Sequence, residues 1–179
     1  MKITKNRGLK LLKVFHLLSA FLWTGGAFSM MILVFFVKPD EGYGMQTFAV
    51  SLKMIDDWMV IIGAIGCFIT GLLYGIVTRW GFFKHRWITV KWITALYMMI
   101  SGTFAMGPCV DGNVLLSEDI SQYRLNSEMF WNNVLSIKWW GAIQILLLVV
   151  TIIISIYKPW ERKKWNNHNH NIGITKNDA

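Results

Sequence analysis

The chain has 179 residues, of which 54% are hydrophobic and 16% are charged, and its formal net charge is +8. A basic balance of this size suits nucleic acid where lysines and arginines form a patch, but here they flank four apolar runs. Each run has about 20 residues with few charges, the length of a membrane-spanning helix. The composition therefore excludes an ordinary soluble domain and a nucleic-acid partner. It predicts an all-α, polytopic protein embedded in the lipid bilayer.

The predicted spans lie at about residues 11–37, 58–78, 87–107 and 139–157, within one domain, 1–160. The tail, 161–179, is expected to be cytoplasmic and disordered. Thirteen of the 18 lysines and arginines lie before the first span, between the second and third, or after the fourth. Because such an excess marks cytoplasmic segments, both termini are expected in the cytoplasm. The predicted fold is a four-helix up-down bundle in the bacterial cytoplasmic membrane.

The first span contains a histidine, His16, about one turn into its apolar run. An ionisable side chain at membrane depth is a candidate functional residue. His16 and Trp23 fall on one face of the predicted helix. Gly25 and Gly26 follow near mid-membrane, where they permit close helix approach or a local bend. The alternative is that His16 only packs against another helix near the cytoplasmic interface.

The second span has a small residue at every fourth position: Gly63, Cys67, Gly71 and Gly75. This spacing is typical of membrane helices that pack closely. The stripe is expected to contact another helix of the same chain, and a homo-oligomer or a partner membrane subunit is the alternative.

The third span has a lysine, Lys91, four residues after its first residue, Trp87. His16 and Lys91 are both expected about 6 Å inside the cytoplasmic boundary, so they can share a site. Alternatively, the long side chain of Lys91 reaches back to the lipid headgroups. Met98 lies on the same predicted face as Lys91.

The connection over residues 108–137 mixes polar residues with short apolar groups. We expect it to include an amphipathic segment that lies on the membrane surface. In the fourth span, Gln144, Thr151 and Ser155 fall on one face.

The pattern His16-x6-Trp23-x-Gly25-Gly26, with Trp87-x3-Lys91 in the third span, resembles the clan of four-helix membrane proteins around the copper-resistance-D domain. The clan includes a family of predicted integral membrane proteins and, more distantly, the haem-binding protoporphyrinogen oxidase of J type. The resemblance covers the four-span core and implies the fold. The oxidase branch would have Tyr-His late in the third helix, where this chain has Tyr97-Met98.

Three functional hypotheses follow. The first is a b-type haem or porphyrin site near the cytoplasmic side, with His16 as iron ligand, Lys91 pairing a propionate, Trp23 nearby and Met98 as second ligand. The second is copper handling from the outer side, with methionine thioethers and Cys109 as soft ligands. The third is a structural or accessory subunit without a cofactor.

Overall fold

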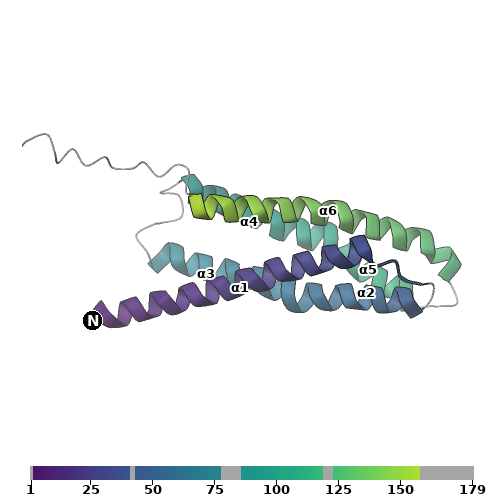
Figure 1. Cartoon of the computed structure of the whole chain (residues 1–179), viewed down its shortest axis with the longest axis horizontal. Helices are drawn as coiled ribbons and strands as arrows, with labels where there is room; N and C mark the ends of the chain where they lie inside the picture. Colours follow the sequence, from purple (N-terminus) through teal and green to yellow (C-terminus); the bar gives the residue numbers. More distant parts are fainter. Residues whose placement is uncertain (1, 41–42, 78–85, 119–122, 158–179) are drawn as a thin grey trace, which may run out of the picture.

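The computed structural model describes residues 2–40, 43–77, 86–118 and 123–157, and every regular element in these ranges is helical. Four rods lie side by side in alternating directions (Figure 1). The first is α1 (Lys2–Phe36) and the fourth is α6 (Tyr123–Tyr157). The second joins α2 (Tyr43–Ile55), the π-helical η1 (Asp56–Ile61) and α3 (Ile62–Val77), and the third joins α4 (Arg86–Ser101), the π-helical η2 (Gly102–Met106) and α5 (Gly107–Glu118).

The rods are long and apolar enough to cross a membrane. In the described ranges four helices meet this criterion, with lengths of 30, 35, 33 and 31 residues. The predicted all-α, four-helix membrane architecture is therefore confirmed. At 1.5 Å per residue each rod is about 45–50 Å long, which exceeds the roughly 30 Å of a bilayer core.

The extra length comes from helices where the sequence analysis placed connections. α2 precedes the predicted second span, and α5 follows the third without a break. Both belong to the bundle, because α5 packs against α2 and α6. The prediction of an amphipathic segment lying on the membrane surface is therefore wrong for residues 107–118 and 123–137.

We divide the bundle into a distal half and a proximal half. The distal half contains the end of α1, α2, α5 and the first part of α6, and the proximal half contains the rest (Figure 1). The distal half has a continuous apolar core whose members come from all four rods: Met30, Met31, Val34, Met45, Phe48, Ala49, Leu52, Val110, Phe130, Val134 and Ile137. Apolar residues buried at helical spacing are typical of a water-soluble bundle.

The proximal half buries fewer side chains and exposes apolar ones. Its smaller core consists of Trp23, Ala64, Met98 and Leu148. Its exposed positions carry phenylalanine, leucine and isoleucine, for example Phe21, Ile65 and Leu146. A helix that presents apolar side chains outward is suited to lipid, in which packing depends on close contact rather than on exclusion of water.

The closest helix contact in the proximal half joins α1 to α3 through glycine. A Cβ atom on Gly63 would overlap the backbone of Trp23, and one on Gly66 would overlap the hydroxyl of Ser19. On the other side of this contact, a Cβ on Gly26 would lie 2.7 Å from the Cβ of Met59. The predicted contact within the chain is therefore present at Gly63 and Gly26.

The last two residues of the predicted stripe on the second span, Gly71 and Gly75, turn away from α1. Steps of four residues advance about 40° beyond a full turn each time, so Gly71 and Gly75 lie progressively further around the helix than Gly63. A Cβ on Gly71 would meet the ring of Trp92, in α4, at an ordinary 3.8 Å. Gly25 is similarly loose, since its nearest neighbour is a methionine methyl group 3.9 Å away.

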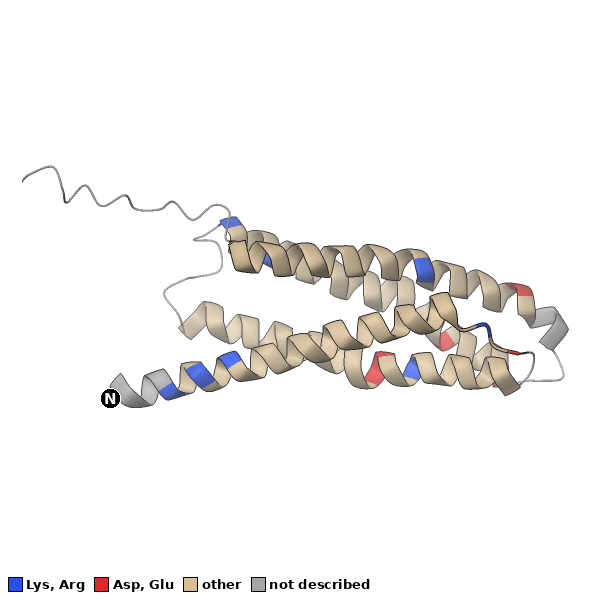
Figure 2. Cartoon of the chain, viewed as in Figure 1, with Lys and Arg blue, Asp and Glu red and all other residues tan. Residues whose placement is uncertain are grey.

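Charged residues divide between the two halves (Figure 2). Basic residues lie in the early part of α1, from Arg7 to Lys13, and at the start of α4, whereas the acidic residues lie in the distal half together with Lys38, Lys53 and Lys138. There the ammonium of Lys53 lies 2.8 Å from the carboxylates of both Asp57 and Asp111, which ties α2 to η1 and α5. The predicted tail, 161–179, lies outside the described residues.

Candidate functional site

His16 lies in the proximal half at the contact between α1 and α3. Its Nδ1 atom is 2.8 Å from the hydroxyl oxygen of Thr70 in α3. The ring of Tyr74, one turn further along α3, meets the His16 ring edge-on with centroids 6.2 Å apart. The Cys67 thiol lies 3.8 Å from the backbone carbonyl of His16. His16 is thus held from one side by three residues of a single helix.

The hydrogen bonds of Thr70 favour one tautomer of His16. The Thr70 hydroxyl is 2.6 Å from the carbonyl of Gly66 and 2.8 Å from Nδ1 of His16, and its single proton can serve only one of them at a time. Donation to Gly66, the shorter contact, leaves the hydroxyl oxygen to accept from His16 with the imidazole proton on Nδ1. In that tautomer Nε2 has a lone pair. A hydrogen bond to the other ring nitrogen is the usual support of a histidine that ligates a metal.

Lys91 approaches the same site from α4. Its ammonium is near enough to His16 and Cys67 for its charge to act on both. The ammonium also lies 5.9 Å from the ring centroid of Trp87, one turn nearer the start of α4. This charge interaction is compatible with a site shared by His16 and Lys91, which stays a prediction. The side chain also turns toward the end of the bundle, as the alternative interpretation of a lysine reaching for the headgroups requires.

Trp23 and Met98 belong to a different cluster. Both are buried in the proximal core with Ala64 and Leu148. Trp23 is seven residues beyond His16 on α1, which is about 10 Å along the helix axis. The structure thus places Trp23 and Met98 in one cluster that includes neither His16 nor Lys91. The other histidines, His85, His168 and His170, lie outside the described residues.

Several of the methionines proposed as copper ligands fill the distal core. Met30, Met31 and Met45 are buried there, and Cys109 packs against the same core. Met31 occupies the space that Gly141 leaves on α6. Unbranched thioether side chains commonly fill such irregular gaps. In the described ranges no group of three or more histidine, cysteine or acidic side chains could hold a metal ion.

Polar side chains also join α4 to α6. The hydroxyls of Thr94 and Thr151 are 3.1 Å apart, and the amide of Gln144 donates to Ser101 at 3.3 Å. Gln144 also donates to the carbonyl of Met98 at 3.4 Å. The polar face predicted for the fourth span is therefore turned toward α4 at Gln144 and Thr151. Each hydroxyl in these pairs can hydrogen-bond either to its own helix or to the partner helix. Helix association is therefore enough to explain these polar residues.

Thr70 and Tyr74 were missed by the sequence analysis. A threonine in a membrane helix ordinarily bonds its own i−4 carbonyl, as Thr70 does, so its sequence context gives no sign of a second partner. The available signal was the spacing Gly63, Gly66, Thr70, Tyr74, which averages about 3.7 residues and therefore follows one face of a helix.

Comparison with known proteins adds no assignment: no family model, curated protein or solved structure matches the chain.

Proposed function

We propose that the chain is a multi-pass membrane protein that holds a b-type haem or related porphyrin in its proximal half, as a redox or accessory protein. The observation that supports this most is the 2.8 Å contact between Nδ1 of His16 and the hydroxyl of Thr70, because the tautomer in which His16 donates there leaves a lone pair on Nε2. The resemblance to the copper-resistance-D clan selects the same histidine and Lys91.

In this proposal the chain supplies one ligand to the haem iron. His16 would supply that nitrogen, and Lys91 would pair with a propionate. Met98 lies with Trp23 in a separate cluster, so a His16/Met98 pair is not part of this proposal. A haem held in this way supplies one-electron chemistry, and the part of the chain is to hold the group through Nε2 and to keep the imidazole in one tautomer.

A visible spectrum tests the proposal. Protein purified in detergent from haem-replete cells is expected to show a Soret band, with the haem present in about one copy per chain. Protein prepared without haem is expected to acquire the same band when haem is added. A colourless preparation that also fails to take up added haem would contradict the proposal and favour the cofactor-free accessory protein.

We extend the proposal to orientation: the chain termini and the His16 site face the cytoplasm, and the distal half projects from the opposite surface. The support is the concentration of basic residues at the proximal end and of acidic residues in the distal half (Figure 2).

Cysteine labelling in intact cells tests this orientation. The starting variant replaces Cys67 and Cys109 with alanine. Glu118→Cys, at an exposed distal position, is expected to react with a membrane-impermeant maleimide, and Arg7→Cys, exposed on α1, is expected to react only after the cells are lysed. The reverse pattern would show the opposite orientation, and equal labelling of both positions in intact cells would contradict the four-span topology.

A further inference from the structure

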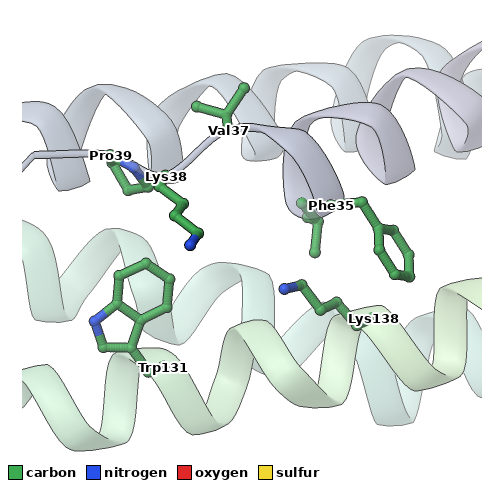
Figure 3. A pocket seen from close by; sticks show the side chains of 7 residues that line it. Phe35, Val37, Lys38, Pro39, Trp131 and Lys138 are labelled. Atoms are coloured by element: carbon green, nitrogen blue, oxygen red, sulfur yellow. The ribbon is translucent and has the colours of Figure 1, made fainter.

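A cavity of about 460 Å³ opens on the flank of the bundle where α1 ends beside α6 (Figure 3). Its walls come from two separate segments of the chain, and the lining residues are Val34, Phe35, Val37, Lys38, Pro39, Trp131 and Lys138. The cavity is remote from His16, which lies about 30 Å from Lys38 along the axis of α1. The cavity is therefore distinct from the proposed haem site.

Two lysines face this cavity from opposite sides. Lys38 follows the end of α1, Lys138 belongs to α6, and both ammonium groups point into the space between the two segments (Figure 3). Lys138 lies 5.6 Å from the ring centroid of Phe35. In the part of the chain that the structure describes, the ion pairs within 4.0 Å involve Lys53, and neither Lys38 nor Lys138 has a carboxylate partner. Two such cations beside one cavity favour an anion between them.

The other walls are apolar, and except for the buried Val34 and the half-buried Pro39 they are exposed. Val37 and Trp131 are 42% and 41% exposed, and Phe36, adjacent to the cavity, is 82% exposed. Lys138 directly precedes Trp139 and Trp140, at the point where the apolar part of α6 begins. Tryptophans at the end of an apolar stretch mark the level of the headgroups. The two ammonium groups thus lie at the height at which lipid phosphates are found, beside walls that suit the upper part of an acyl chain.

We propose that this cavity binds the phosphate of an anionic phospholipid, such as phosphatidylglycerol, between Lys38 and Lys138. Lysine acts as a point charge toward phosphate, and its flexible stem packs along apolar surface, which here includes Phe35. A soluble phosphate would use the same two cations but would gain nothing from the exposed apolar walls. The lipid is therefore the occupant that accounts for both parts of the cavity.

Native mass spectrometry of the full chain in detergent, titrated with phosphatidylglycerol, tests the proposal. We expect the first phosphatidylglycerol to bind more tightly than those that follow. In the double variant Lys38→Gln/Lys138→Gln the affinity for this first lipid is expected to fall at least about tenfold, because each charge-assisted hydrogen bond contributes that order of affinity. In Lys38→Arg/Lys138→Arg the affinity for this first lipid is expected to stay within about threefold of the parent value. Phosphatidylcholine, which adds a quaternary ammonium to the same phosphate, is expected to bind at least about tenfold more weakly.

Lys10→Gln/Lys13→Gln is the matched control, since it removes two exposed lysines at the other end of α1. This control variant is expected to bind the first phosphatidylglycerol as tightly as the parent protein. Unchanged binding in Lys38→Gln/Lys138→Gln, or loss in the Lys10/Lys13 control alone, would overturn the site. Displacement of phosphatidylglycerol by an equal concentration of inorganic phosphate would overturn the lipid as occupant and indicate a soluble anion. If the double glutamine variant does not fold, Lys38→Gln alone, which lies outside the helices, makes the same comparison.

Discussion

Replacing Gly63 with alanine is expected to destabilise the bundle by about 3 kcal/mol, the upper part of the range for overpacked sites. The new Cβ would overlap the backbone nitrogen and Cα of Trp23 and lie 2.9 Å from the carbonyl oxygen of Ser19. Backbone atoms cannot rotate away as a flexible side chain can, so α1 and α3 would have to separate. The unfolding free energy in mixed micelles, followed by circular dichroism during titration with a denaturing detergent, measures this change.

Gly71→Ala is the matched control on the same helix. Its Cβ would contact the Trp92 ring at 3.8 Å, which is ordinary van der Waals distance. Since alanine also favours helix over glycine, the unfolding free energy is expected to stay within about 1 kcal/mol of the parent value. Equal losses in the two variants would show that the contact between α1 and α3 is not the tight one.

Loss of the haem band in His16→Ala is the second large effect that we expect, because the substitution removes the only protein nitrogen proposed to hold the iron. Lys91→Ala is expected to weaken haem retention without abolishing the band, since a propionate partner is lost while the iron ligand remains. The measurement is the Soret absorbance per chain after gel filtration.

Two further variants separate ligation from packing. Thr70→Val keeps the shape of the side chain but removes the hydroxyl that hydrogen-bonds with Nδ1 of His16. It is expected to retain the fold and to weaken haem affinity about 10–100-fold, the usual cost of losing the hydrogen bond that orients a ligating histidine. Met98→Leu is expected to leave the spectrum unchanged. A spectrum altered by Met98→Leu and unaffected by Thr70→Val would contradict this arrangement.

The part of the fold that the sequence predicted best is the part that lies in lipid. Uninterrupted apolar runs identify such helices directly, because the bilayer requires them. α2 was missed because polar residues, among them Gln46, Ser51 and Lys53, interrupt its apolar run, although Met45, Phe48, Ala49 and Leu52 are buried along one face. The periodicity of these four residues predicts a helix, but only a bundle longer than the predicted spans gives that helix something to pack against.

The candidate site was predicted in part for a similar reason. His16 and Lys91 are conspicuous because charge is costly at membrane depth, and their shared site stays a prediction. Thr70 has no such signature, and Met98 was placed beside Lys91 by helical periodicity alone. Periodicity predicts which face of a helix a residue occupies, but not which residue of a neighbouring helix lies at the same height. Met98 belongs to the buried cluster of Trp23, which does not include His16.

Chemical rescue of His16→Gly tests the central claim most directly. Deleting the imidazole leaves a space that free imidazole can fill with the same nitrogen donor. The variant is expected to lack the Soret band of the parent protein and to regain it when millimolar imidazole and haem are added together, whereas Thr70→Val should need no imidazole. An unchanged haem band in His16→Gly without imidazole would show that His16 is not the ligand and would contradict the account.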